Sequence, residues 1–106
     1  MIMRQFADVV SKYDIYIAPY MQPRPPRDEN APPPPPTPPG PIRDHFSVAN
    51  LCGYPAVSVP NGFDEKGRPT GMTFLGRLYA EAEVLAVAKA YQDVARWHER
   101  KPQLLV

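Results

Sequence analysis

The first residues of the chain show two hydrophobic patterns in succession. Apolar side chains recur every three to four positions over residues 2–13, which predicts a helix with one apolar face. Residues 15–18 are all apolar and Pro19 follows them, so we expect a short strand rather than more helix. A strand that is apolar on both sides is typical of the inside of a sheet covered on both faces. The helical face comprises Ile2, Phe6, Val9, Val10 and Tyr13.

The middle of the chain predicts a short helix followed by a hairpin. The helix covers residues 44–52, where Asp44 can cap its start and Gly53 suits a left-handed residue just past its end. Two apolar arms follow within residues 55–77, joined by the polar stretch 64–69. This order is typical of an antiparallel hairpin with a wide loop.

The clearest predicted element is a helix over residues 81–100. Glu81 and Glu83 lie in its first turn and several basic residues in its last, which suits the helix dipole, and Pro102 ends it. We expect its broad apolar stripe to face a core. The stripe comprises Val84, Leu85, Val87, Ala88, Tyr91, Val94 and Ala95.

Proline is the unusual feature of the composition. Twelve of the 16 prolines lie between Pro19 and Pro41, and consecutive prolines favour the polyproline II conformation. One interpretation is a ligand for an SH3- or WW-type groove, flanked by Arg24 and Arg27. The other, which we favour because core-like sequence lies on both sides, is a stiff surface loop over residues 19–43.

The length and the net charge of the chain narrow the classes of protein to which it can belong. A chain of 106 residues allows one domain, and a net charge of +1 gives no field that would concentrate nucleic acid or an anionic membrane. No apolar run approaches the roughly 20 residues that span a bilayer. The first residues lack the order of a signal peptide, so we expect a cytoplasmic protein.

No catalytic constellation or cofactor motif emerges from the residues themselves. A single cysteine, Cys52, excludes an internal disulfide and a thiol-rich zinc site, and no phosphate-binding loop is present. Ser58 lies between two valines in a predicted strand, which is typical of an ordinary sheet serine. His45 and Cys52 are separated by close to two helical turns, but a buried structural cysteine is the commoner arrangement. We therefore expect no cofactor and no metal.

One region of the chain carries a more specific pattern. Residues 50–63 read N-L-C-G-Y-P-A-V-S-V-P-N-G-F, residues 67–77 read G-R-P-T-G-M-T-F-L-G-R, and residues 81–85 read E-A-E-V-L. In this order they closely resemble the C-terminal region of the amidase signature family, which shows N-L-x-G-x-P-A-x-x-x-P-x-G-F followed by G-x-P-x-G-x-x-x-x-G-R. Residues 14–19 also resemble the D-x-x-x-x-P strand of that family. The resemblance covers the chain except for its Pro-rich insert.

The resemblance implies an α/β fold. That family folds as one large mixed sheet wrapped by helices, several times longer than this chain. We therefore expect residues 1–106 to form a C-terminal segment of such a domain, with a Pro-rich loop at 19–43. The segment would contribute about three strands, including the hairpin, to a partial mixed sheet with flanking helices.

The resemblance also indicates what chemistry is absent. Members hydrolyse amides, or transfer ammonia from an amide, with a Ser nucleophile, a bridging Ser and a Lys base. These residues lie in a Gly/Ser-rich signature and an upstream Lys motif, and neither motif occurs here. No catalytic residue is therefore carried over, and we expect the chain alone to be inactive. Asp44 lies near the carboxylate of glutamine-using members, about one residue out of register, and is the one candidate substrate-binding residue.

We predict the first of three interpretations of the function and keep the other two as alternatives. The first is a segment of an amidase-signature hydrolase, truncated or encoded by a partial reading frame, whose partner is the missing N-terminal catalytic portion and whose substrate is a small amide. The second is a non-enzymatic interaction module that uses the polyproline loop or an open sheet edge. The third is a separately encoded subunit that completes a split amidase.

Overall fold

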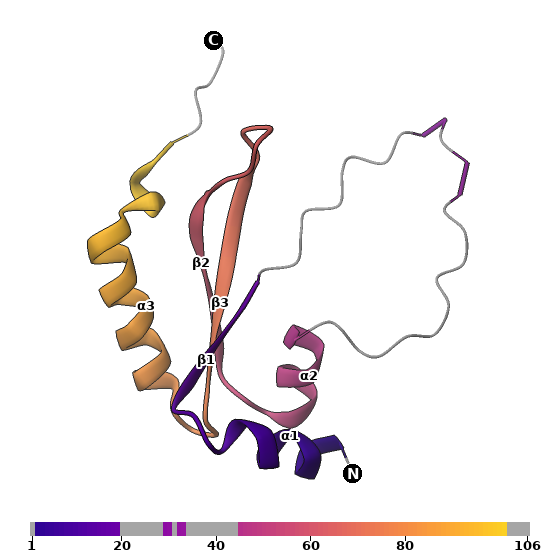
Figure 1. The fold of residues 1–106 in the computed structure, drawn as a ribbon, viewed down its shortest axis with the longest axis vertical. Coiled ribbons are helices and arrows are strands. Elements are labelled where there is room, and N and C mark those ends of the chain that lie inside the picture. The colour runs from indigo at the N-terminus through magenta and orange to yellow at the C-terminus, as the bar shows by residue number, and fades with distance from the viewer. Residues whose placement is uncertain (1, 20–28, 31, 34–44, 102–106) are drawn as a thin grey trace.

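The computed structural model describes residues 2–19, 29–30, 32–33 and 45–101. Its three strands form one sheet in the order β1-β3-β2, and both neighbouring pairs are antiparallel (Figure 1). The prediction of three strands with flanking helices is confirmed, although the described strands show no parallel pairing. The elements are α1 (Ile2–Val10), β1 (Ile15–Pro19), α2 (His45–Cys52), β2 (Ala56–Phe63), β3 (Pro69–Gly76), α3 (Glu81–Ala95) and a 3₁₀ turn, η1 (Trp97–Glu99).

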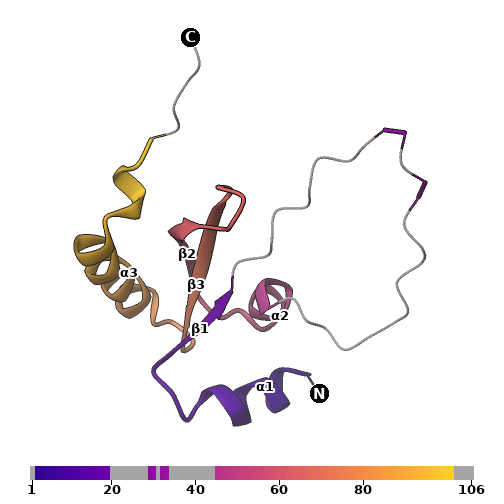
Figure 2. The same ribbon diagram turned by 45° about the horizontal axis from the view of Figure 1, so that its top comes forward.

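Helices lie on both sides of the sheet, with α3 opposite α1 and α2 (Figures 1 and 2). On one face, Val59 and Phe74 pack against Val84 and Ala88 of α3. On the other face, Ala18 and Leu75 pack against Ala49 of α2. Residues that face each other in an antiparallel register lie on the same side of the sheet. Because successive side chains of a strand point to opposite sides, each strand can contribute residues to both clusters.

The first helix and strand differ in part from the sequence prediction. Helix α1 ends at Val10, and Tyr13 is exposed rather than on a buried face. Strand β1 lies at an edge of the sheet rather than inside it. Ile17 is 62% exposed although it faces Phe74, which is 3% exposed. A local run of apolar residues predicts a strand but carries no information about which elements will cover it.

The predicted hairpin is confirmed. Gly67 adopts a positive φ of 75° in the turn, as expected from its place in the polar reversal. The pairing shifts between Pro60 and Gly62, so a bulge lets β2 continue to Phe63. A Cβ on Gly76 would clash with Cγ2 of Val84, which explains the glycine there as a point of close approach between β3 and α3.

Helix α3 is shorter than the helix predicted over residues 81–100. It ends at Ala95, where Arg96 takes a left-handed conformation (φ 55°) and its N–H donates to the Gln92 carbonyl. The Arg96 guanidinium pairs with the Glu99 carboxylate at 2.8 Å within the 3₁₀ turn that follows. Glycine is the usual sign of such a helix end, and an arginine in its place gives no comparable signal in the sequence.

Most of the Pro-rich loop predicted at residues 19–43 lies outside the described residues, and so does Asp44. Of that loop, Pro19 closes β1, residues 29–30 form a turn, and Glu29, Pro32 and Pro33 are exposed. Across the described helices, none is long and apolar enough to pass through a bilayer.

Candidate functional site

Ser58 contributes a hydrogen bond within the sheet. Its hydroxyl lies 2.8 Å from the hydroxyl of Thr73, the residue it faces in the register of β2 and β3. Thr73 is buried, so this bond satisfies a polar group that would otherwise be unpaired away from water. The interpretation of Ser58 as an ordinary sheet serine is confirmed.

Cys52 is a buried residue at the end of α2. Burial, together with the neighbouring Cys52 and Tyr54, raises the pKa of Tyr16 to about 12, so this phenol keeps its proton at neutral pH. The ring of Phe6 packs edge-on against Tyr54 at 4.9 Å between centroids. The surroundings are those of a packed cluster, and the side chain of His45 lies outside the described residues.

The candidate substrate-binding residue lies outside the described part of the chain, and the described part contains no cluster of metal-ligating side chains. Asp44, the one substrate-binding candidate from the sequence, is not described, and α2 begins at the following residue. Within the described ranges, no three His, Cys, Asp or Glu side chains gather as metal ligands would.

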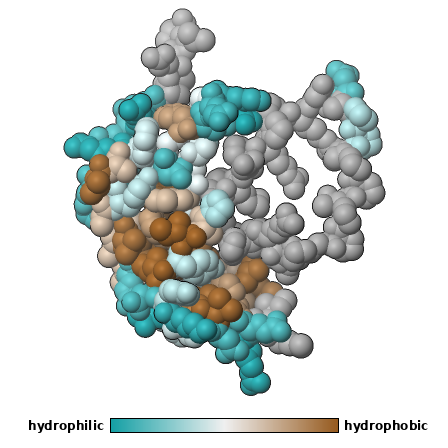
Figure 3. Space-filling model, in the orientation of Figure 1, coloured by the Kyte–Doolittle hydropathy of each residue, from teal (hydrophilic) through white to brown (hydrophobic). Residues whose placement is uncertain are grey.

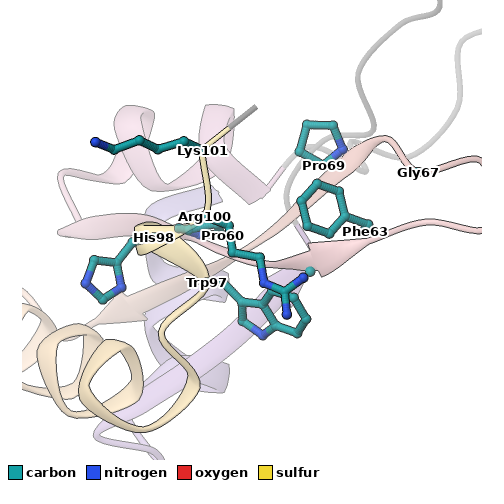
Figure 4. Close-up of a pocket in the computed structure, with 9 residues that line it drawn as sticks. Pro60, Phe63, Gly67, Pro69, Trp97, His98, Arg100 and Lys101 are labelled. Carbon is teal, nitrogen blue, oxygen red and sulfur yellow. The ribbon is translucent and has the colours of Figure 1, made fainter. Parts of the chain in front are cut away.

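The described residues do form a groove of about 670 Å³ at the far end of the hairpin (Figure 4). One wall is the hairpin, with Phe63 and Pro69, and the other is the 3₁₀ turn with Trp97. The rings of Phe63 and Trp97 meet edge-on, with 6.1 Å between centroids. The groove is lined by Pro60, Gly62, Phe63, Gly67, Pro69, Trp97, His98, Arg100 and Lys101. We call it the Trp97 groove.

The bulge in β2 makes room for the indole in this groove. Gly62 is buried with φ 132°, and a Cβ placed on it would lie 3.7 Å from the Trp97 ring. A side chain is disfavoured at that φ, so glycine is needed by the backbone while the ring packs directly over it. The Arg100 guanidinium lies over the same indole at 4.9 Å from its centroid, a cation–π arrangement.

The hairpin loop beside the groove is held by Asp64. Its carboxylate accepts from the backbone N–H of Arg68 at 2.8 Å and of Lys66 at 2.9 Å, and from Arg68 Nε at 2.7 Å. The hydrogen bond from the Arg68 backbone is the largest cause that lowers the pKa of Asp64. The loop therefore presents Gly67 and Pro69 to the groove on an ordered turn.

A second surface feature is an uncovered apolar strip between α3 and β1. Leu85 and Gln92 line a hollow against β2, so helical geometry places Val87 on the opposite flank of α3, toward β1. Val87 and Ile17 are both exposed. Figure 3 shows apolar side chains gathered over this side of the molecule. We call Ile17 and Val87 the β1 strip.

The comparisons with known proteins identify the family of this chain. The sequence profile of the family described as Amidase matches residues 1–85. The chain belongs to the amidase family. Its N-L-C-G helix end, bulged hairpin and closing helix are thus parts of an amidase fold, as the resemblance predicted.

Named relatives extend the family assignment. The A subunit of glutamyl-tRNA(Gln) amidotransferase from Thermodesulfovibrio yellowstonii is 44% identical over 64 residues, which is 59% of this chain and 13% of that protein. The protein of the same name from Thiobacillus denitrificans is 47% identical over 65 residues, which is 60% of this chain and 13% of that protein. The chain thus corresponds to a small portion of these longer proteins.

A solved structure shows the same fold. The A subunit of glutamyl-tRNA(Gln) amidotransferase from Thermotoga maritima superimposes with a TM-score of 0.57 at 24% identity, over 90% of this chain and 20% of that one. The α/β arrangement of the described residues is therefore one portion of a much larger amidase fold.

The Trp97 groove is a feature that the sequence does not predict, because Trp97 stands there as one of several scattered aromatic residues. The groove depends on a contact between Trp97 and Gly62, which are far apart in the sequence. The Asn-Gly pair at 61–62 inside a strand is the only local signal, because a glycine in a strand marks a bulge or a close approach.

Proposed function

We propose that this chain is a sheet-forming portion of an amide hydrolase, in which carbon–nitrogen bonds are cleaved by residues outside these 106. The family match over residues 1–85 carries the proposal. In this proposal the chain is the C-terminal portion of the domain, and its partner is the N-terminal catalytic portion, whether on the same polypeptide or on another. A cytoplasmic location stays a prediction from the sequence.

The open edge of the sheet supports this division of roles. Strand β1 ends the described sheet, and one edge of its backbone has no neighbouring strand among the described residues. An exposed edge beside an apolar strip is a surface that further strands or helices can cover. The β1 strip thus fits contact with the rest of the domain.

The chemistry implied by the family would enter from that other portion. A Ser nucleophile needs a base and a bridging group to activate it, together with donors that stabilise the oxyanion. Ser58, the serine of the hairpin, is engaged with Thr73 in the sheet. The role left to this chain is to complete the sheet and to help wall the substrate pocket.

The proposal is tested by complementation. The chain is co-expressed with an amidase-family relative from which the matching portion has been deleted, and the pair is purified through a tag on one partner. We expect a stable complex that hydrolyses at least one member of a panel of simple aliphatic and aromatic amides. Each partner alone should be inactive. A chain that is monomeric, cooperatively folded and indifferent to the catalytic portion would contradict the proposal.

A pair of substitutions tests whether the β1 strip is the contact. Ile17→Asp places a charge where the proposal buries an apolar side chain, and we expect at least a roughly tenfold loss of complex. Leu85→Asp makes the same chemical change on the opposite flank of α3, at a side chain that is 61% exposed, and should leave the complex intact. Equal loss of complex in both variants would show that the β1 strip is not the contact.

Asp44 enters the proposal as a substrate contact. If its carboxylate binds the amino group of a substrate such as glutamine, Asp44→Asn in the active complex should raise KM several-fold for that substrate and leave kcat nearly unchanged. Simple amides without an amino group serve as the control, because their KM should not change. A fall in kcat for both kinds of substrate would assign Asp44 a structural role.

A further inference from the structure

The Trp97 groove is not explained by the proposed function, and its chemistry points to a ligand. Its lining combines two aromatic rings with two prolines, Pro60 and Pro69, which gives a ridged apolar surface. Aromatic-lined grooves of this kind bind polyproline II segments, because the prolines are already extended and lose little conformational entropy on binding. A volume of about 670 Å³ is ample for several residues of such a segment.

The groove also contains a positively charged side chain, Arg100, that can bind an acidic group of a ligand. The ion pairs of the described residues engage Arg68, Arg77, Lys89 and Arg96, and none of them includes Arg100. The Arg100 guanidinium lies over the Trp97 ring (Figure 4), which leaves the edges of that planar group able to donate to a carboxylate. Among the described residues that line the groove there is no aspartate or glutamate. An acidic ligand is therefore favoured over a neutral or basic one.

This chain itself contains a segment with the matching chemistry. Glu29 lies three residues before the start of the proline run at Pro32, and Glu29, Pro32 and Pro33 are all exposed. We propose that the Trp97 groove of one copy binds these three residues of a second copy, with the Glu29 carboxylate on Arg100 and the prolines against the aromatic rings. The contact is reciprocal, so two copies can form a dimer by exchanging their segments.

Several features favour a second copy over the chain's own segment. In the described structure Glu29, Pro32 and Pro33 are exposed, so exchange between copies needs no change in the rest of the molecule. Phe63, a principal wall of the groove, is also 51% exposed, so the receiving surface is open. The interaction does not involve the β1 strip, so it is independent of the proposed contact with the catalytic portion.

Trp97 gives a direct way to test the proposal, because it is the only tryptophan of the chain. A synthetic peptide of residues 27–38 is titrated into the full 106-residue chain while tryptophan fluorescence is recorded. We expect a saturable change. Peptides with Glu29→Gln, or with Pro32→Ala and Pro33→Ala together, should bind at least tenfold more weakly. No change with the natural peptide would overturn the proposal.

Matched variants of the chain locate the contact. Arg100→Gln removes the cation over the indole and should weaken peptide binding at least tenfold, and Phe63→Ala should weaken it several-fold. Lys66→Gln removes the same charge from the exposed hairpin turn outside the groove lining and should have no effect. Circular dichroism of each variant checks that the fold is retained. Equal losses of peptide binding for Lys66→Gln and Arg100→Gln would show that binding depends only on the overall charge of the chain, and would overturn the proposal.

Sedimentation measurements test whether the groove binds a second copy of the chain or some other ligand. We expect the chain to dimerise with rising concentration, and Arg100→Gln to remain monomeric at the same concentrations. A monomer whose groove is already filled by its own segment would show no dimer and no peptide binding, and would overturn the exchange. Acetate or benzoate that changes the fluorescence as strongly as the peptide would show a simple anion site instead and would equally overturn it.

Discussion

The two flanks of the sheet differ in how completely helices cover them. Where α3 crosses β2 and β3, Val59, Phe74, Val84 and Ala88 form a closed cluster with little exposed area. One strand further, at β1, the same face of the sheet ends in the exposed Ile17. Both regions are apolar in sequence, so the difference lies in coverage rather than in composition.

The apolar residues of this chain therefore fall into two groups, those that α3 covers and those at the uncovered flank of β1. The hairpin and α3 are adjacent in sequence and bury one another, so local contacts suffice for that half. The flank at β1 leaves an apolar surface exposed, and under the proposed function the rest of a longer domain covers it. The chain spans about 13% of the length of the curated relatives it matches. Substitutions in the covered half should therefore change stability far more than substitutions at the uncovered flank.

The largest effect is expected from removing a side chain at the centre of the covered region. Phe74 belongs to the cluster under α3 and is 3% exposed, and Phe74→Ala should lower the free energy of unfolding by about 3–5 kcal/mol. Ile17→Ala, at the uncovered flank, should change it by no more than about 0.5 kcal/mol. Urea unfolding of both variants measures the contrast, and equal losses would show that β1 is as well covered as β3.

The contact between β3 and α3 should be nearly as sensitive. Gly76→Ala introduces a Cβ against Val84 and should cost about 1–3 kcal/mol through overpacking. Because the clash involves one methyl group, Val84→Ala in the same molecule should recover part of that loss. A double-mutant cycle with no coupling between the two positions would contradict the close approach.

A smaller effect is expected at the hydroxyl pair of β2 and β3. Ser58→Ala leaves the buried Thr73 hydroxyl without its partner and should cost about 1–2 kcal/mol. Thr73→Val made together with Ser58→Ala removes both polar groups and should restore most of the stability. A double variant less stable than Ser58→Ala alone would show that Thr73 makes another essential bond.

The smallest effect concerns the hairpin loop and its dependence on pH. The pKa of Asp64 is lowered in the folded chain, chiefly by the Arg68 backbone hydrogen bond. Its contribution to stability is therefore complete above the pKa of an unfolded aspartate and is lost as the pH falls through the lower folded pKa. Asp64→Asn should reduce this acid dependence, as measured by urea midpoints between neutral and strongly acidic pH. An unchanged profile would contradict the assignment.

Local patterns predict most of the elements because the relevant forces act over a few residues. The hairpin follows from Gly67 and the polar reversal around it, and α3 begins where Glu81 and Glu83 indicate. The end of α3 does not follow, because Arg96 adopts a left-handed conformation without the glycine that usually marks it.

Features that depend on distant contacts cannot be predicted in this way. The position of β1 at a sheet edge depends on which strand pairs with it, and its apolar sequence fits an inner strand equally well. The Trp97 groove depends on the packing of the Trp97 indole over Gly62, and β3 and α3 lie between these two residues in the sequence. The sequence carries such long-range information only through its resemblance to a family.

Hydrogen exchange at β1 tests the central claim most directly. The amides of β1 and of α3 are compared by mass spectrometry in the isolated chain and in the complex with the catalytic portion of an amidase relative. We predict that β1 exchanges much faster than the core of α3 in the isolated chain, and slows at least roughly tenfold in the complex while the α3 core changes little. A β1 already protected in the isolated chain, or unchanged in a complex that forms, would contradict the account.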